Sequence, residues 1–455
     1  AVEGETVEVT ASKPLIEVSQ TNVARTIDSE DIENFAVRNV TSMVAAQAGV
    51  VVQHDGMHIR GSRGEEIGYT LEGASMTGAG GKVVSNAIPE ALEAVAVQVG
   101  GYDASIGNAN GGMVQQSLKT GGSKLSASVL IENMQGGDAW AATGDKDITA
   151  TFSGPIGNNI RFFGAVRKKH TDNYSSNSRW FTPFTIADGT PMPDKIGGLT
   201  ESGDMVVLST AGNYVFRDVD HDGVYTAPGT DADGHAIGDE ASYRGMNNSY
   251  AFDNEQDDLS INGSLQWDMN PLVIRLGGSY NSYTYSGAGL PIQGMFNTRR
   301  HENAGQNYLL NAKATYFLNT NTYIRANFST VGRKYESYDK KFKEEGIFKD
   351  GHTSKLSDWL KFGDREAVAL VDTNWARHFG TPGADPTSDV YRYVEPSNYN
   401  VNGFRFQRDG ARRGGYSKGE DGYINFNGEF VTQMGEHELK LGGAYTKYNY
   451  RRNSY

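Results

Sequence analysis

Apolar and polar residues alternate over long stretches of the chain from residue 124 onward. In the stretch 259–267, every second residue from Leu259 to Trp267 is apolar or glycine, and the residues between them are polar. A period of two predicts β-strands whose two sides face different surroundings. Every second residue is again apolar or glycine in the stretches 148–152, 160–166, 272–280, 308–318, 324–328, 424–430 and 439–445.

The connections between these strands differ in length at the two ends. Short turns are expected at 154–159, 268–270, 319–321 and 434–436, and long excursions at 171–256, 286–304 and 336–419. This arrangement is typical of a transmembrane β-barrel, and it predicts about nine strands after Gly122. Bacterial single-chain barrels have an even strand number. We therefore expect this chain to be the N-terminal portion of a longer protein.

The polar face of the predicted strands carries charges such as Lys313 and Arg325. Such side chains are costly in a packed core but tolerated in a water-filled or plug-filled lumen. The alternative is a soluble β-sandwich with one wet face, whose strands are usually shorter. Aromatic residues near the strand ends are expected to form girdles at the membrane surfaces; they are Trp267, Tyr316, Tyr445, Tyr448 and Tyr450.

The chain up to Gly122 has a different character, with short segments and glycine-rich turns. Ser29 is expected to cap a helix over 31–35, and a second helix is expected over 40–48, ended by Gly49. Short strands are predicted at 49–52, 58–60, 67–71, 94–99 and 113–119. We expect an N-terminal segment 1–13, a small α+β domain 14–122 and a strand array 123–455. A globular unit followed by such an array suggests a plug inside a membrane barrel.

Composition narrows the function classes. The 455 residues include 56 Gly and 24 Tyr but no Cys, which excludes disulfides, thiolate metal sites and a cysteine nucleophile. The formal net charge of −13 argues against a nucleic-acid partner. No apolar run approaches the ~18 residues of a transmembrane helix, but barrel strands do not require one.

The residues up to Gly122 resemble the plug domain of TonB-dependent outer-membrane receptors. The resemblance rests on three runs, which are GETVEVTASKPLIEVSQTNVARTIDSEDIENFAVRNVTSMVAAQAGVVV, HIRGSRGEEIGYTLEGASM and NAIPEALEAVAVQVGGYDASIGNANGGMVQQSLKTGG. It is closest to the large receptors that often carry a carboxypeptidase-regulatory-like domain ahead of the plug. The resemblance implies an α+β plug followed by an antiparallel transmembrane barrel of about 22 strands, of which this chain holds the first part.

The resemblance also implies roles for individual plug residues. The TonB box would comprise Glu5, Thr6, Val7, Glu8, Val9, Thr10 and Ala11. It would be recognised by the periplasmic protein TonB as an added strand; the alternative is an ordinary first strand. Arg60 and Arg63 would face barrel carboxylates, or else be ordinary surface arginines. Glu72-Gly73 departs from the usual Asp-Gly, which leaves a turn intact but weakens the expectation of a role for Glu72.

One loop carries a candidate metal site. Asp218, Asp220 and Asp222 alternate ahead of Gly223, as at the start of a calcium loop. The Glu that usually closes such a loop is absent, and Asp231 or Asp233 would take its place. The alternative is an acidic external loop, since Asp and Gly also suit turns.

Other chemistry has little support. His54 and His58 are placed on a strand, where they do not converge on zinc. There is no GxSxG nucleophile motif, and no GK[ST] follows the glycine runs. We therefore expect no enzyme activity.

The external loops are expected to choose the ligand, through Trp180, Phe296, Arg299 and Arg300. Aromatic rings beside polar groups suit sugars or peptides, and arginine pairs suit carboxylates. The resemblance implies a receptor in the bacterial outer membrane that imports a sugar, a peptide or a chelate, energised through the inner-membrane TonB complex. Its expected partners are TonB, outer-membrane lipids and a surface lipoprotein. The alternative is a surface-display or assembly component that presents calcium-bound loops without active import.

Overall fold

The computed structural model of the chain describes two units and several short strands in the connections. The described residues are 24–35, 39–53, 56–79, 81–82, 84–100, 110–133, 144–171, 255–287, 301–339 and 417–454, with isolated strands between 185 and 244, between 347 and 354 and between 399 and 406.

The first unit is a small domain around a five-stranded sheet in the order β1-β8-β9-β4-β5. All neighbours in this sheet are antiparallel except β4 and β9. Its strands are β1 Ala24–Asp28, β4 Ile67–Leu71, β5 Ala74–Ser75, β8 Leu92–Gln98 and β9 Gly112–Leu118. Two further pairs are β2 Val50–Gln53 with β3 Gly56–Ile59, and β6 Thr77–Gly78 with β7 Gly81–Lys82. Two single-turn 3-10 helices, η1 Gly64–Glu66 and η2 Pro89–Ala91, lead into β4 and β8.

The two α-helices of the small domain are short. Helix α1 spans Ser29–Asn34, and its cap is Asp28, whose carboxylate accepts from the N–H of Asp31 at 3.0 Å. The predicted cap, Ser29, is therefore wrong by one residue, because Asp28 already accepts from the first turn. Helix α2 spans Val40–Ala45 and ends earlier than predicted. Neither described helix has the length and apolar character that crossing a membrane requires.

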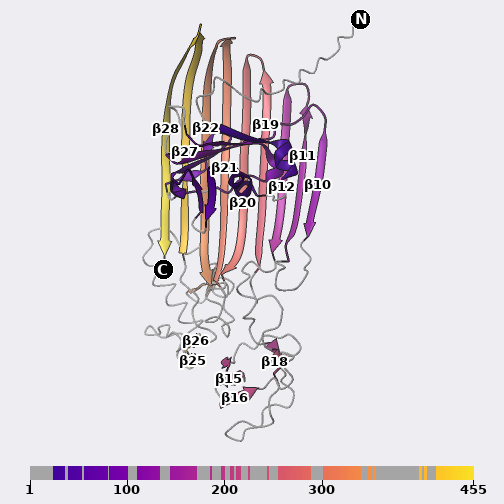
Figure 1. Ribbon diagram of the computed structural model, residues 1–455, viewed down its shortest axis with the longest axis vertical. Coiled ribbons are helices and arrows are strands. Elements are labelled where there is room, and N and C mark those ends of the chain that lie inside the picture. Colours follow the sequence, from indigo (N-terminus) through magenta and orange to yellow (C-terminus); the bar gives the residue numbers. More distant parts are fainter. Residues whose placement is uncertain are drawn as a thin grey trace.

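The second unit is a nine-stranded antiparallel sheet whose spatial order follows the chain (Figure 1). Its strands are β10 Ser126–Asn133, β11 Lys146–Ile156, β12 Ile160–Thr171, β19 Gln256–Met269, β20 Leu272–Gly287, β21 His301–Asn319, β22 Thr322–Asp339, β27 Ser417–Met434 and β28 His437–Ser454. The expected domain boundary at Gly122 lies between the end of β9 and the start of β10. Strands β20 to β22 extend further toward the long connections than the alternation indicated.

The described parts of the connections hold only short strands. They are β13 Thr185–Ile186, β14 Ile196–Leu199, β15 Met205–Ser209, β16 Gly212–Phe216, β17 Val224–Tyr225, β18 Tyr243–Arg244, β23 Ile347–Lys349, β24 His352–Ser354, β25 Tyr399–Val401 and β26 Phe404–Phe406.

The predicted alternation is confirmed by the burial of the two faces of the large sheet. Leu310 and Phe426 on the outer face are 58% and 56% exposed, whereas Asn262 and Asn311 on the inner face are 1% and 4% exposed. A sheet with apolar residues outside and polar residues inside fits a barrel wall in lipid. The expectation of an α+β plug followed by antiparallel barrel strands is confirmed.

Two of the expected girdle residues face inward instead. The Tyr448 ring lies 5.9 Å from the ring of Tyr423, whose hydroxyl donates to the small domain. Tyr450 shares the face of Tyr448 because it is two residues further along β28. The prediction for Tyr448 and Tyr450 is therefore wrong, because both lie an odd number of residues from Tyr445 and so belong to the opposite face.

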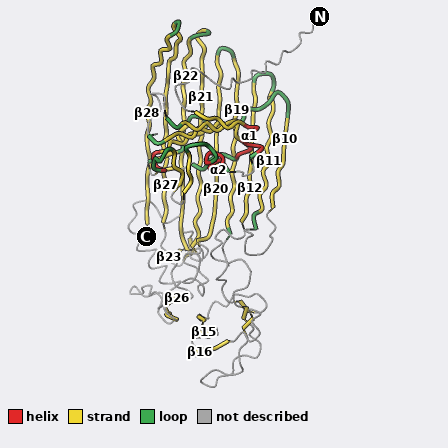
Figure 2. Tube along the Cα trace, in the orientation of Figure 1, coloured by secondary structure: helices red, strands yellow, loops and turns green. Residues whose placement is uncertain are grey.

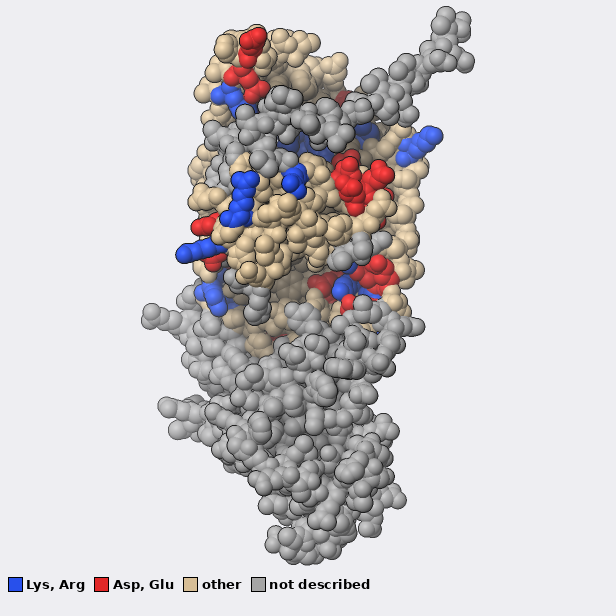
Figure 3. Space-filling view, viewed as in Figure 1, with Lys and Arg blue, Asp and Glu red and all other residues tan. Residues whose placement is uncertain are grey.

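The small domain lies against the inner face of the large sheet (Figures 1 and 2). One buried apolar cluster joins the two units, with Leu71, Val95 and other small-domain residues on one side. The sheet contributes Phe163, Ala165, Leu309, Val331 and Tyr423 from strands β12 to β27. The sheet therefore curves around the small domain, as a barrel wall does around a plug. On the face shown in Figure 3, charged side chains form small separate groups rather than one patch of a single sign.

The segment that leaves the small domain passes very close to β12. A Cβ atom on Gly121 would lie 2.1 Å from the carbonyl oxygen of Phe162, whereas a Cβ on Gly122 would have no neighbour nearer than 3.8 Å. We therefore expect Gly121→Ala to push this segment away from the wall and to destabilise docking of the small domain by about 1–3 kcal/mol.

Thermal unfolding of the purified protein, with protease cleavage of the small domain as a second readout, measures this effect. Gly122→Ala is the matched control and should behave as the unmodified protein. Equal effects of the two substitutions would contradict the close approach at Gly121.

Candidate functional site

The tip of the β4–β5 hairpin is a two-residue turn made of Glu72 and Gly73. Leu71 pairs with Ala74 across it, and both turn residues have positive φ, 54° and 82°. Such turns favour Asn, Asp or Gly, and a left-handed conformation costs other residues about 1–2 kcal/mol. Glu72 therefore occupies a position that its own backbone disfavours, and the compensation has to come from its side chain.

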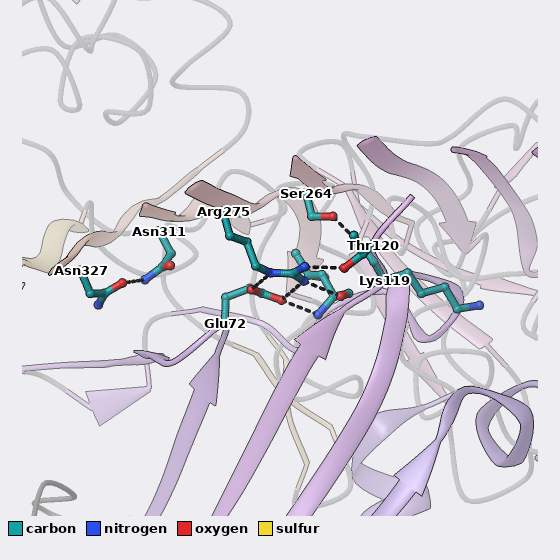
Figure 4. A network of polar contacts seen from close by, with 8 residues as sticks. Glu72, Lys119, Thr120, Ser264, Arg275, Asn311 and Asn327 are labelled. Atoms are coloured by element: carbon teal, nitrogen blue, oxygen red, sulfur yellow. Dashed lines mark hydrogen bonds and ion pairs between the residues drawn. The ribbon is translucent and has the colours of Figure 1, made fainter. Parts of the chain in front are cut away.

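That side chain is buried against the large sheet, where it meets Arg275 of β20 (Figure 4). Nε of Arg275 donates to Oε2 of Glu72 at 2.7 Å, and Nη2 donates to Oε1 at 2.9 Å. The side chain of Glu72 is only 4% exposed, and that of Arg275 is 18% exposed. A two-pronged, charge-assisted contact of this kind is among the strong hydrogen-bonded pairs of proteins.

The same guanidinium also holds the end of β9. Nη2 of Arg275 donates to the carbonyl oxygen of Leu118 at 2.8 Å, and Nη1 donates to the hydroxyl of Thr120. The N–H of Leu118 in turn donates to Oε1 of Glu72 at 2.7 Å. One wall residue therefore ties the hairpin tip and the end of β9 together. We call Glu72, Leu118, Thr120 and Arg275 the latch.

A glycine on the wall makes room for the latch. Gly277 lies two residues beyond Arg275 on the same face of β20, and a Cβ there would lie 2.8 Å from Cγ of Glu72. Any side chain at this position would displace the carboxylate. The close approach of the hairpin to the wall thus depends on Gly277.

The latch keeps Glu72 ionised. Burial by itself would raise the pKa of Glu72, but the hydrogen bonds and charge of Arg275 act in the opposite direction. The N–H of Leu118 and the more distant charge of Lys313 add to this effect. The pKa of Glu72 therefore lies below its ordinary value of 4.5.

The latch differs in kind from the other ion pairs of the sheet. Arg161 pairs with Asp268 at 2.9 Å and Arg325 with Glu429 at 2.5 Å, both within the wall. The Glu72–Arg275 pair instead joins the small domain to the sheet.

The remaining polar contacts between the two units are single hydrogen bonds, most of them to backbone of the small domain. The N–H of Ile88 donates to Oδ1 of Asn262 at 2.9 Å. The hydroxyl of Ser264 donates to the carbonyl oxygen of Lys119 at 2.5 Å, and that of Tyr423 to the carbonyl oxygen of Ser75 at 2.6 Å. Each of these bonds can be exchanged for a bond to water when the units separate.

A further polar pair lies on the same wall. Nδ2 of Asn311 donates to Oδ1 of Asn327 at 2.8 Å (Figure 4). This bond joins β21 to β22 within the wall.

The predicted plug arginines lie elsewhere. Arg60 is exposed, with φ of 51°, and its N–H donates to the carbonyl oxygen of Gly49. Arg63 caps η1, where its N–H donates to Glu66 at 3.0 Å. Within the described part of the chain, neither arginine pairs with a carboxylate of the sheet. Their expected pairing with barrel carboxylates stays a prediction. In the observed pair, the plug supplies the carboxylate of Glu72 and the wall supplies the guanidinium of Arg275.

The role of Glu72 was underestimated from the sequence. The change from the family's Asp to Glu was expected to weaken a role for this residue, whereas the structure makes it the centre of the contact. The reason is the partner, which lies 203 residues away in the chain.

The other predicted sites lie outside the described residues. These are the TonB box at residues 5–11, the loop residues Trp180, Phe296, Arg299 and Arg300, and the calcium candidates Asp218, Asp220, Asp222, Asp231 and Asp233. Among the described residues, no group of three or more His, Cys, Asp or Glu side chains is placed to hold a metal ion.

The latch predicts how docking of the small domain to the sheet depends on pH. A carboxylate whose pKa is lowered by folding stabilises the docked state fully above its ordinary pKa of 4.5, and this stabilisation is lost as the pH falls through the lowered pKa. Glu72→Gln leaves Arg275 buried without its partner, so we expect docking to weaken by about 3–5 kcal/mol at neutral pH. The variant should also lose the acid-dependent part of the transition.

Thermal unfolding between pH 3 and pH 7 measures both effects. The double variant Glu72→Gln with Arg275→Gln should recover part of the loss, because no buried charge remains. Glu33→Gln is a control, since Glu33 pairs with Lys119 at the surface of the small domain. An unchanged pH profile in Glu72→Gln would rule out the latch as its origin.

Comparisons with known proteins agree with this geometry. Residues 17–114 match the family described as TonB-dependent Receptor Plug Domain. The chain is 26% identical over 231 residues to the TonB-dependent transporter Oar of Myxococcus xanthus, and the match covers 41% of this chain and 22% of Oar.

Solved structures with a similar fold include several receptors. The siderophore receptor PirA from Pseudomonas aeruginosa has a TM-score of 0.34 and 13% identity, over 94% of this chain and 57% of PirA. The ferric citrate transporter FecA has a TM-score of 0.42 and 10% identity, over 96% and 57%. The alcaligin receptor FauA from Bordetella pertussis has a TM-score of 0.44 and 8% identity, over 96% and 57%. This chain therefore spans little more than half the length of these structures, and less than a quarter of Oar.

The family consists of receptors and transporters rather than enzymes. The matched sequence and its place in the curve of the sheet lead to one assignment: residues 17–114 form a plug domain of the type found in TonB-dependent receptors.

Proposed function

We propose that the protein is an active importer in which the plug is released from the wall by a pull from the periplasm. The observation that carries the proposal is the way the plug is held. One buried ion pair and several single hydrogen bonds join it to the sheet within the described part of the chain. Such a joint is specific in position but can be opened without unfolding the wall.

The direction of the pull follows from the family. TonB would take the segment 5–11 as an added β-strand, because an unpaired extended segment offers its backbone groups to another sheet edge. The force would then reach β1, which pairs with β8 in the central sheet of the plug. Strand β8 pairs with β9, and the end of β9 is held by Arg275. Only β8 therefore separates β1, which would receive the force, from β9, whose end belongs to the latch.

Release has to separate both the polar contacts and the apolar cluster that joins plug and wall. Each single hydrogen bond contributes about 1 kcal/mol net, and the two groups of the ion pair regain water when the units separate. No bond is made or broken in a substrate, so no catalytic group is needed. A nutrient held on the loop side would then pass along the polar wall, and its class is taken up below.

Deleting residues 5–11 tests the importer proposal. Cells that carry the intact receptor should deplete at least one solute from a complex growth medium, and cells with the deletion should not. Mass spectrometry of the spent medium measures the depletion. Membrane abundance and protease resistance of the variant serve as controls for folding. Depletion that survives the deletion would favour a display or assembly role over import.

A disulfide between plug and wall tests release directly. A Cβ on Gly277 would lie 3.5 Å from Cβ of Glu72, within the usual range for a disulfide, and the chain has no other cysteine. We expect Glu72→Cys with Gly277→Cys to block solute depletion when oxidised and to regain it after mild reduction.

The two single-cysteine variants are the matched controls and should be insensitive to oxidant. Import that continues at full rate through the oxidised double variant would show that this hairpin need not leave the wall.

A further inference from the structure

On the loop side of the latch, the same inner wall carries three tyrosine rings. Tyr283 and Tyr285 lie on β20 and Tyr335 lies on β22. They share the inner face with Arg275 of β20 and Val331 of β22, which contact the plug. In strand register, Tyr283 faces Gly305 and Tyr335 faces both Gly305 and Gly419. The three tyrosines line a hollow of about 150 Å³ together with Asn303, Ala304, Arg333 and Glu336. We call this group the tyrosine platform.

The glycines explain how the rings lie. A Cβ on Gly305 would be 2.4 Å from the Tyr283 ring, and a Cβ on Gly419 would be 2.2 Å from the Tyr335 ring. Each ring therefore lies across a glycine, flat against the wall. Tyr283 and Tyr285 have centroids 6.0 Å apart and planes inclined by only 25°. Tyr283 and Tyr285 thus lie side by side along the wall with their faces toward the lumen, whereas the guanidinium of Arg333 lies over the Tyr335 ring, 5.2 Å from its centroid.

Two buried polar atoms beside the platform are left over. Nε of Arg333 and Oδ1 of Asn307 have no hydrogen-bond partner among the described residues. Asn307 and Arg333 are cross-strand neighbours on β21 and β22. Buried polar groups are normally satisfied, so a donor and an acceptor left open side by side point to a partner that supplies both.

The platform also borders the plug. Nδ2 of Asn307 donates to Oδ1 of Asn281 at 3.2 Å and approaches the hydroxyl of Ser85 in the plug at 3.5 Å. A ligand on the platform would therefore lie next to Asn307, a wall residue that contacts the plug.

We propose that the tyrosine platform is a subsite for a ring of a neutral saccharide, and this rests on the importer function proposed above. A sugar ring has a C–H face that packs on the electron-rich face of an aromatic ring. Its hydroxyl groups both donate and accept, so they satisfy Asn307 and Arg333 together. The hollow is smaller than the ~300–1,000 Å³ of whole ligand pockets, which fits one ring of a longer chain.

The charges around the platform favour a neutral ligand over an acidic one. Asp421 is the cross-strand neighbour of Arg333 and is 2% exposed. A ligand carboxylate on Arg333 would lie near this buried carboxylate and would be repelled. A carboxylate also only accepts hydrogen bonds, which would leave Oδ1 of Asn307 without a donor. An organic cation only donates, and it would meet the guanidinium already stacked 5.2 Å from the Tyr335 ring.

Calorimetric titration of the complete receptor in detergent tests the proposal. The probes are neutral hexasaccharides built of glucose, mannose or galactose, with hexagalacturonate and 2,3-dihydroxybenzoate as acidic probes. We expect at least one neutral hexasaccharide to bind more tightly than either acidic probe. Tyr283→Ala and Tyr335→Ala should each weaken that binding by about tenfold or more. Tyr283→Phe and Tyr335→Phe should retain it, because the ring face remains.

Two further variants separate the platform from general effects on folding. Gly305→Ala should lift the Tyr283 ring from the wall and weaken binding, although no ligand-contacting group is removed. Tyr280→Ala, on the outer face of the same strand, should leave binding unchanged. The proposal is overturned if no neutral hexasaccharide binds, if the tyrosine variants bind as the unmodified receptor does, or if an acidic probe binds through the same tyrosines in preference.

The importer proposal can survive that failure. If deleting residues 5–11 stops depletion of a solute that is not a saccharide, the receptor is an importer and the ligand proposed for the platform is wrong. If the hexasaccharide binds but depletion is insensitive to the deletion, the platform stands and the importer proposal fails.

Discussion

The buried charge of Arg275 is the constraint on which the arrangement of plug and wall depends. A guanidinium on the inner face of a barrel strand has to be compensated, and here the compensation comes from another domain. Glu72 reaches it only because the hairpin turns tightly, because Gly277 leaves space and because the end of β9 supplies an N–H and a carbonyl oxygen. The backbone strain at Glu72 is thus understandable as the cost of placing a carboxylate at this point.

The rest of the contact has a different character. Leu309, Val331 and Phe163 of the wall join the apolar core of the plug, and they provide non-directional adhesion. Asn262, Ser264 and Tyr423 add single hydrogen bonds to backbone groups. The ion pair therefore sets the register of the plug in the wall, whereas the apolar contacts set how firmly it is held. A joint divided in this way can be released at one point and can close again in the same position.

The inner wall has two functions along one set of strands. Near the short turns, β20 contributes Arg275 and Gly277 to the latch. Further along the same face it contributes Asn281 to the row beneath the plug, and then Tyr283 and Tyr285 to the platform. Glycine is used in both places for the same physical reason, because it lets a side chain from a neighbouring element lie directly on the backbone. A ligand on the platform and the plug would thus share a continuous surface.

The sequence by itself determined the strands, their pairing and their two faces, because a period of two is a local property of the chain. It also indicated a plug domain, which the family match over residues 17–114 confirms. The inward face of Tyr448 also followed from its odd spacing from Tyr445. The sequence did not determine that Glu72 would meet Arg275 or that Tyr283 would lie across Gly305. These contacts join residues from separate strands or separate units, and their partners are chosen by strand register and by the curvature of the sheet. Only the tertiary structure brings such residues together, because no local pattern specifies which distant side chain will occupy the space beside a glycine.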